Sequence, residues 1–372
     1  MFKQYSIRNY HFRLVCYVLA LSVIGILVIG SAKASVQKTQ IVGLFLGLIV
    51  MAVVSLVDYS FILRFSWLFY FLNLVLLALV EVMGSDANGA TRWVSIAGLR
   101  FQPSELSKII IIIFFAYFFM KYQETLNTIK ILAASFILVG IPLVLVVTQP
   151  DLSTTIVTAL IFVSLLFIAG LSYKIVLGVL AVSVPSAIIF LSLILQPGQK
   201  ILNDYQYRRI MAWLNPKAYA DDAYQQQNSI MAIGSGRLWG KGLNNNDIAS
   251  VKNGNFISEP QTDFIFAVAG EELGFVGAAL IVILLFLIVI ECILIARKAK
   301  DLSGRLIACG MASLIGFQGF VNICVVTGLM PNTGLPLPFV SYGLTSLTTL
   351  YIGIGLVLNV GLQPRDPSHC PV

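Results

Sequence analysis

Ten apolar stretches, each long enough to cross a lipid bilayer, dominate this sequence of 372 residues. A hydrocarbon core about 30 Å thick needs roughly 20 apolar residues in a helix, whereas a transmembrane β-barrel would show short alternating segments. Only 11% of the residues are charged, far fewer than in soluble globular domains. We therefore expect an all-α integral membrane protein with about ten transmembrane helices. The stretches lie near residues 14–31, 41–57, 66–83, 106–120, 131–148, 152–169, 174–195, 264–295, 307–329 and 340–362.

The distribution of basic residues predicts the topology. An even number of spans places both ends of the chain on one side of the membrane. Most basic residues of the short loops fall on that side, including a cluster between Arg297 and Arg305, so the positive-inside rule makes it cytoplasmic. The first stretch follows Lys3 and Arg8 as a signal peptide would, but its length and the spans that follow favour an uncleaved helix.

The exterior side carries the two loops of interest. We expect one membrane domain over residues 1–372, within which residues 196–262 form a large extracellular loop between the seventh and eighth spans. This loop is too long for a simple connection and too aromatic for a disordered linker, so we expect short helices packed on the membrane surface. The loop at 84–102 includes Trp-Val-Ser-Ile, residues 93–96, which we expect to return to the membrane interface.

Several classes of chemistry are excluded by composition. The two histidines, His11 and His369, lie at the termini, which excludes Ser-His-Asp, Cys-His and histidine-zinc sites. The five cysteines show no metal-binding spacing. The net charge of +7 is spread over membrane-flanking loops, which indicates topology and anionic headgroups rather than a nucleic-acid partner. Any catalysis must therefore use carboxylates, basic residues and hydroxyls.

Two candidate clusters lie at the exterior ends of the fourth and sixth spans. Glu105 and Lys108 are three residues apart on one helix face, where they form either a structural ion pair or, with Arg92, a binding site for an anion. Gln149 and Asp151 precede a run of hydroxyl residues, a pattern typical of a helix start.

The long loop contains the third cluster, with Arg208 and Arg209 followed by the glycine-rich segment 234–242. Glycines beside Lys241 would bring main-chain N–H groups close to a phosphate, although a plain turn explains the same residues.

The last candidates flank the eighth and tenth spans. Asp263 follows Thr262, a suitable cap, and would occupy the first turn of the eighth helix; this is a good helix start or a functional carboxylate. Glu271, two turns deeper, would support the same cavity. The segment 328–346 interrupts the apolar pattern and supplies hydroxyls, among them Ser341 and Ser346, and such irregular backbone survives in a membrane only when it is buried or lines a polar cavity.

Six motifs in order resemble the SEDS family (shape, elongation, division and sporulation) of the RodA, FtsW and SpoVE type, most closely its RodA members. They are RWVSIAGLRFQPSELSK, QPDLSTT, YQYRRI, NSIMAIGSGRLWGKGL, EPQTDFIFAVAGEELGFVG and MPNTGLPLPFVSYG, between residues 92 and 346.

The resemblance implies a peptidoglycan glycosyltransferase. Such an enzyme joins lipid II units, disaccharide-pentapeptides on undecaprenyl diphosphate, by inverting hexosyl transfer at the outer face of the bacterial cytoplasmic membrane. Diphosphate is a good leaving group, so the reaction needs a base for the acceptor hydroxyl and cations for the developing charge. We expect Asp263 to be the base. The expected substrate-binding residues are Arg92, Glu105, Lys108, Gln149, Asp151, Arg208, Arg209, Lys241, Glu271, Ser341 and Ser346.

The resemblance leaves several points open. One open point is a divalent cation, Mg²⁺ or Mn²⁺. If the reaction uses one, carboxylate oxygens would hold it, and Asp263 would then be a metal ligand rather than a base. No organic cofactor is expected. The implied partners are a class B penicillin-binding protein and other proteins of an elongation or division complex. Alternative functions are a lipid II flippase or other transporter, or a membrane scaffold for the penicillin-binding protein. Elongation, division and sporulation are not distinguished.

Overall fold

The computed structural model describes residues 10–363, apart from 88–89, 97–98, 195, 197–203, 245–249, 251–253 and 255. Each of the ten apolar stretches forms a helix, as predicted. Among the described residues, seven of these helices are long and apolar enough to span a membrane, and two shorter apolar helices accompany them. The ten are α1 (Phe12–Ala32), α2 (Ala34–Leu56), α4 (Ser66–Met83), α5 (Pro103–Lys121), α6 (Ile129–Thr148), α7 (Leu152–Ile168), α8 (Tyr173–Ile194), α11 (Ile265–Arg297), α12 (Leu302–Val326) and α13 (Leu344–Leu362).

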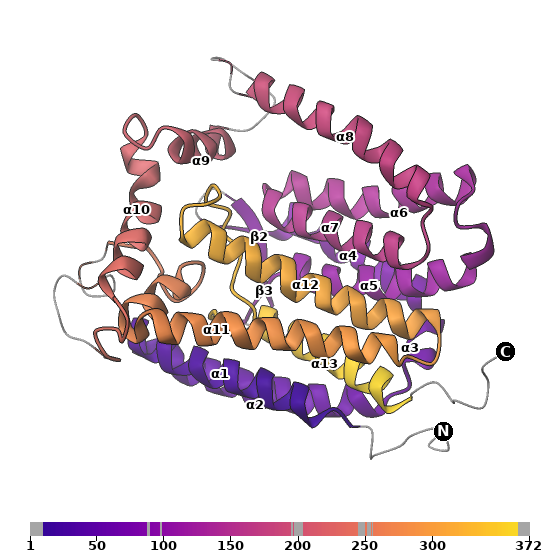
Figure 1. Cartoon of the computed structure of the whole chain (residues 1–372), viewed down its shortest axis with the longest axis horizontal. Helices are drawn as coiled ribbons and strands as arrows, with labels where there is room; N and C mark the ends of the chain where they lie inside the picture. The colour runs from indigo at the N-terminus through magenta and orange to yellow at the C-terminus, as the bar shows by residue number, and fades with distance from the viewer. Residues whose placement is uncertain are drawn as a thin grey trace.

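Helix α5 lies at the centre of the bundle. In its apolar stretch 83% of the residues are buried, compared with 33% in α2, so α5 contacts protein on nearly all sides. It packs against α4, α7 and α12, while α11 lies beside α12 and α1, and α13 packs on α2 (Figure 1). On α2, exposed residues such as Phe45 and Ile49 present an apolar face that suits contact with lipid. Figure 1 shows α8 apart from the other helices.

The two ends of the described chain meet at one end of the bundle. A Cβ built at Gly361, near the end of α13, would lie 2.8 Å from Cδ2 of His11, the residue before α1. This proximity agrees with the predicted even number of crossings.

The loop at 84–102 forms a small antiparallel sheet that the sequence did not predict. Strands β1 (Ser85–Ala87), β2 (Ala90–Ile96) and β3 (Leu99–Phe101) pair in the order β1-β2-β3. Val94 pairs with Phe101 and Ser95 with Arg100. The Trp-Val-Ser-Ile segment that we expected to return to the interface is therefore part of the central strand, where cross-strand partners satisfy its main chain.

The long loop forms two helices, as predicted: α9 (Asp204–Leu214) and α10 (Ala220–Ser235). Both lie at the end of the bundle where α11 begins, and α10 packs against α11 (Figure 1). Two further short elements were not predicted, α3 (Tyr59–Arg64) and the 3₁₀ turn η2 (Gln123–Thr125). Asp58 caps α3 by accepting a hydrogen bond from Ser60 N–H.

Candidate active site

Asp263 lies in a turn before α11 and not in its first helical turn. The helix begins at Ile265, and its N-cap residue, Phe264, provides no side-chain hydrogen bond. The hydroxyl of Thr262 donates backward to the Glu259 carbonyl at 2.9 Å. The prediction that Thr262 caps the helix was therefore wrong, because a preceding turn uses this hydroxyl.

Three hydrogen bonds from distant segments hold the turn that carries Asp263. The carbonyls of residues 261, 262 and 263 each accept one of these bonds. The donors are the Tyr342 N–H to Gln261 at 2.9 Å, the Ser341 hydroxyl to Thr262 at 2.7 Å and the Asn322 amide to Asp263 at 2.8 Å. Ser341, a predicted site residue, thus lies directly beside the turn. Buried polar main chain rarely stays unpaired, so these bonds fix the path of the turn.

The Asp263 carboxylate and the Arg209 guanidinium approach each other at Gly334. A Cβ built at Gly334 would lie 3.3 Å from Asp263 Oδ2 and 3.6 Å from Arg209 Nη1. Both charged side chains are partly exposed. Gly334 has φ of +74°, a left-handed conformation that glycine adopts without strain. The fold thus joins a carboxylate and a cation from distant parts of the sequence, at a point with little room for any other side chain.

Side chains from several helices hold the irregular segment 332–337, which carries Gly334. Its carbonyls accept hydrogen bonds, and the N–H of Leu337 donates to the Ser341 hydroxyl at 2.7 Å. The donors to Asn332, Thr333, Leu335 and Pro336 are, respectively, Arg209 at 3.4 Å, Ser153, Asn322 at 2.6 Å and Gln318 at 2.9 Å. This pairing accounts for irregular backbone inside a helical membrane bundle.

Glu105 and Lys108 form the predicted pair on one face of α5. Lys108 Nζ lies 2.7 Å from Glu105 Oε1, and the lysine and glutamate are 1% and 2% exposed. Lys108 also donates to Gln318 Oε1 at 2.6 Å, and Gln318 bonds the Pro336 carbonyl. A buried charge requires such partners. Lys108 is therefore connected to the 332–337 segment through one amide.

The glycine-rich segment after α10 supplies hydrogen-bond partners to main-chain groups on both sides of a break in α11. Gly274 has φ of 65° and ψ of −165°, which interrupts the helix. The N–H groups of Lys241 and Gly242 donate to the carbonyls of Glu271 and Glu272, both at 2.9 Å. On the other side of the break, the N–H groups of Phe275 and Val276 donate to the carbonyls of Arg237 and Leu238 at 2.8 and 3.2 Å.

This pairing corrects the interpretation of the segment as an anion-binding nest. The main-chain N–H groups beside Lys241 already donate to α11 and do not face a phosphate. The glycines instead permit close approach, since a Cβ at Gly236 would lie 2.0 Å from the Gly270 carbonyl oxygen. A Cβ at Gly240 would lie 2.1 Å from the Glu272 carbonyl oxygen.

Lys241 and Glu271, two further predicted residues, form an ion pair of 2.7 Å next to this break. The side chain of Lys241 is 25% exposed and that of Glu271 is 4% exposed. Glu272 accepts a hydrogen bond of 2.5 Å from Ser31 at the end of α1. Arg208 pairs with Asp222 at 2.9 Å on the exposed side of α9 and α10.

The other predicted residues lie around the same end of the bundle. Gln149 donates to the Leu77 carbonyl at 2.9 Å, and Asp151 caps α7 by accepting from the main chain and hydroxyl of Thr154. Ser346 is in the first turn of α13. Arg92 belongs to β2, and its side chain lies outside the described residues. The substrate-binding roles of these residues stay predictions.

The residues around Asp263 do not by themselves form a cation site. Among the described residues, no group of three or more His, Cys, Asp or Glu side chains is close enough to hold a metal. Mg²⁺ and Mn²⁺ prefer several oxygen ligands, whereas the Asp263 carboxylate has a guanidinium across Gly334.

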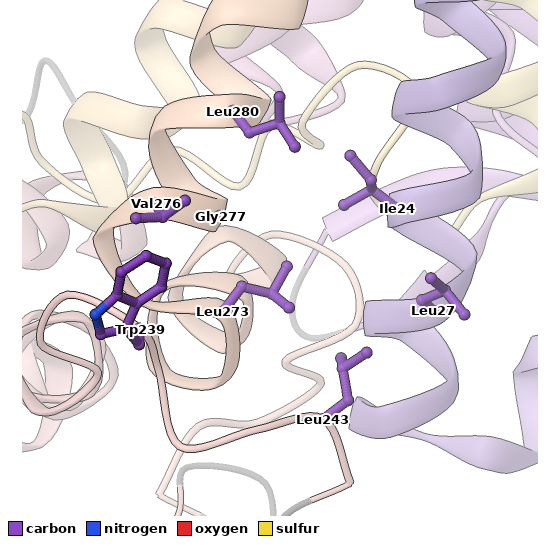
Figure 2. Close-up of a pocket in the computed structure, with 8 residues that line it drawn as sticks. All are labelled: Ile24, Leu27, Trp239, Leu243, Leu273, Val276, Gly277 and Leu280. Carbon is purple, nitrogen blue, oxygen red and sulfur yellow. The ribbon is translucent and has the colours of Figure 1, made fainter.

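A separate apolar groove lies between α1, α11 and the segment after α10. Its volume is about 280 Å³, and Trp239, Leu243 and Leu273 converge on it opposite Ile24 and Leu27 of α1 (Figure 2). The lining is completed by Val276, Gly277 and Leu280. With no titratable side chain in this lining, the groove offers contact to hydrocarbon and supplies no acid or base.

Sequence reasoning missed Asn322 and Gln318, which hold the site from α12. Both amides are buried, at 1% and 0% exposure. They stand one helical turn apart in an apolar stretch, so they share a helix face. That spacing was the available signal, since buried amides in a membrane helix need partners.

Comparisons with known proteins agree with this architecture. The peptidoglycan glycosyltransferase MrdB of Escherichia coli K12 is 35% identical over 92% of this chain and 90% of its own length. A probable peptidoglycan glycosyltransferase FtsW of Geobacter sulfurreducens is 33% identical over 96% of each chain.

Two solved structures share the fold. One comes from a study of how a peptidoglycan synthase complex coordinates polymerization and crosslinking. Its matching chain has a TM-score of 0.76 and 30% identity, and the match covers 95% of this chain and 97% of that one. The rod shape determining protein RodA of Thermus thermophilus has a TM-score of 0.68 and 29% identity, covering 95% and 96%. The FtsW, RodA and SpoVE family model, described as cell cycle protein, matches residues 9–365. The chain is a multi-pass membrane protein that belongs to this family.

Proposed function

We propose that this chain is a peptidoglycan glycosyltransferase that polymerises lipid II, with Asp263 as the general base. The observation that carries the proposal is the approach of the Asp263 carboxylate to the Arg209 guanidinium at Gly334. An inverting transfer from a diphosphate-linked donor needs one base and one cationic group close together. The named relatives, peptidoglycan glycosyltransferases of both the MrdB and FtsW kinds, support the reaction class.

In the proposed step, the acceptor's sugar 4-hydroxyl oxygen attacks the donor's anomeric carbon and forms the new glycosidic bond. The bond from that carbon to the diphosphate oxygen breaks, and undecaprenyl diphosphate leaves with the electron pair. Asp263 takes the hydroxyl proton, and Arg209 stabilises the charge that develops on the diphosphate.

The other predicted cations differ in their access to substrate. Lys108 is 1% exposed and already has two partners, so it acts on the site through Gln318. Lys241 is partly exposed beside Glu271, and Arg208 is exposed on α9. Among the predicted cations whose side chains the structure describes, Arg209 is thus the one best placed for the diphosphate at Asp263.

The proposal includes a topology. Residues 1–372 form one membrane domain with ten crossings, which combine the seven long apolar helices, the two shorter ones and α8. The termini are cytoplasmic, and the turn at Asp263 and the loop 196–262 face the exterior of the bacterial cytoplasmic membrane. The meeting of His11 with Gly361 and the positive charge of residues 297–305 support this orientation.

A class B penicillin-binding protein is the proposed partner, within an elongation or division complex. The structural relative from a complex that couples polymerization to crosslinking supports this. Relatives named MrdB and FtsW have similar identity, at 35% and 33%, so the choice between elongation and division needs genetic complementation.

The test uses full-length protein purified with its partner and supplied with labelled lipid II. Wild type should form glycan chains, and Asp263→Asn should bind lipid II without extending it. Asp221→Asn, an exposed carboxylate on α10, is the matched control and should polymerise normally. Polymerisation by Asp263→Asn at the wild-type rate would refute the base assignment.

The same preparation tests the alternatives. A flippase would move labelled lipid II across vesicles without forming chains, and a scaffold would do neither. Titration with EDTA and then Mg²⁺ or Mn²⁺ decides whether a divalent cation takes part: loss and restoration of polymerisation would make Asp263 a candidate metal ligand.

A further inference from the structure

Asn322 joins two segments of the site with one side chain. Its amide nitrogen donates to the Asp263 carbonyl at 2.8 Å and to the Leu335 carbonyl at 2.6 Å. The residue is 1% exposed on α12. Both amide protons are therefore used on main-chain carbonyls from segments far apart in sequence.

One of the two segments that Asn322 joins carries Asp263, and the other is contacted by Arg209, the second charged group of the proposed mechanism. The first is the turn that carries Asp263, which is not stabilised by a side-chain cap of α11. The other includes Gly334, next to Leu335, and Asn332, whose carbonyl accepts from Arg209 Nη1 at 3.4 Å. A shift between these segments would change the distance from carboxylate to guanidinium.

We propose that Asn322 is a positioning residue for glycosyl transfer, which sets the separation of Asp263 and Arg209 by fixing the turn of Asp263 to the segment 332–337 that Arg209 contacts. This inference rests on the proposed function of Asp263. Asn322 touches main chain and not the proposed reacting atoms, so it acts through geometry. A displacement of about 1 Å in a reacting group costs up to roughly a hundredfold in rate.

Other side chains of similar size do not meet these requirements. The substitution Asn322→Asp would present a carboxylate to two carbonyl oxygens, so both contacts would become repulsive. Leu has nearly the same shape as Asn and donates nothing, and Ser keeps a single donor on a shorter side chain. The series Asn322→Ser, Asn322→Leu and Asn322→Asp therefore removes the bridge in steps.

Gln226 provides a matched control. Its amide nitrogen also bridges two carbonyls, those of Val325 and Met330, both at 2.7 Å, and the residue is 6% exposed. It contacts neither Asp263 nor the 332–337 segment through these bonds. Gln226→Leu therefore loses two amide-to-carbonyl hydrogen bonds, as Asn322→Leu does, but at a place away from the reacting groups.

The experiment measures kcat and KM for lipid II, lipid II binding and Tm, using the full-length protein with its partner. We expect Asn322→Leu to lower kcat between about ten- and a hundredfold with KM within about twofold. Asn322→Ser should fall between Asn322→Leu and wild type. Gln226→Leu should lower Tm by a similar amount and change kcat less than about twofold.

The outcomes separate this inference from the proposed function. If Asp263→Asn is inactive but Asn322→Leu matches Gln226→Leu in kcat, the positioning role is overturned and the base assignment stands. If Asp263→Asn polymerises normally, the base assignment fails, and the positioning role fails with it. If Asn322→Leu does not fold, Asn322→Ser decides: normal kcat despite a lower Tm would overturn the inference.

Discussion

Two irregular segments beside α11 are held in opposite ways. Residues 237–242 bond to the broken helix through four main-chain hydrogen bonds, two on each side of Gly274, joined by a side-chain ion pair from Lys241. Residues 332–337 are held by side chains from α7, α9 and α12 and by Ser341. Main-chain pairing needs close approach, so it depends on glycine, whereas side-chain pairing depends on particular donors. Changes in the first segment should therefore affect folding, and changes in the second should also affect the site.

Gly240→Ala should have the largest effect. The added Cβ would meet the Glu272 carbonyl oxygen at 2.1 Å and its carbon at 2.4 Å, and φ at Gly240 is +78°. These neighbours are main chain and cannot rotate away, so we expect a loss of at least about 3 kcal/mol or no folded protein. Purification yield and Tm in detergent measure this.

Gly234→Ala is the control for that substitution. Gly234 lies within α10, and a Cβ there meets nothing within 4 Å. It should be neutral or gain up to about 1 kcal/mol from helix propensity. Equal Tm values for the two variants would contradict the main-chain account of this segment.

Lys108→Met should have the next largest effect. It leaves the buried Glu105 carboxylate unpaired and removes the donor to Gln318, so we expect about 3–5 kcal/mol of destabilisation. The double variant Glu105→Gln with Lys108→Met removes both charges and should recover most of the Tm. Failure of the double variant to recover would show that Lys108 matters chiefly through Gln318 and the 332–337 segment.

The helices and the Glu105–Lys108 pair could be predicted because their determinants are local. Apolar length sets each span, and a spacing of three residues places two side chains on one helix face. The turn at Asp263 could not be predicted, because its donors Asn322 and Ser341 lie 59 and 79 residues away. The sequence also showed glycines beside Lys241 but not the broken helix against which they pack, so it left open an anion-binding nest whose N–H groups donate to α11 instead.

Lys241→Met tests whether an ion pair contributes less to stability when main-chain hydrogen bonds already hold its segment. The Lys241–Glu271 distance is 2.7 Å, the same as in the Glu105–Lys108 pair, but Lys241 is 25% exposed and its segment is already held by main chain. The Glu271 carboxylate that loses this partner is only 4% exposed, but water already screens the partly exposed Lys241, so we expect a loss of about 2 kcal/mol, below that of Lys108→Met. Equal losses in Tm for Lys241→Met and Lys108→Met would mean that neither the exposure of Lys241 nor the main-chain hydrogen bonds of its segment lowers the contribution of the ion pair.

Arg208→Ala should have the smallest effect on stability. Arg208 pairs with Asp222 at 2.9 Å, but its side chain is 58% exposed, so we expect a change of about 0.5 kcal/mol or less.

Arg209→Ala, the neighbouring change, removes the bond to the Asn332 carbonyl and the cation opposite Asp263. It should lower kcat/KM for lipid II at least about tenfold more than Arg208→Ala does, because Arg209 contacts the segment 332–337 and lies close to the proposed base at Gly334. Parallel kinetics and melts of the two variants measure this difference, and a larger kinetic loss for Arg208→Ala would move the diphosphate-binding role to the exposed side of α9.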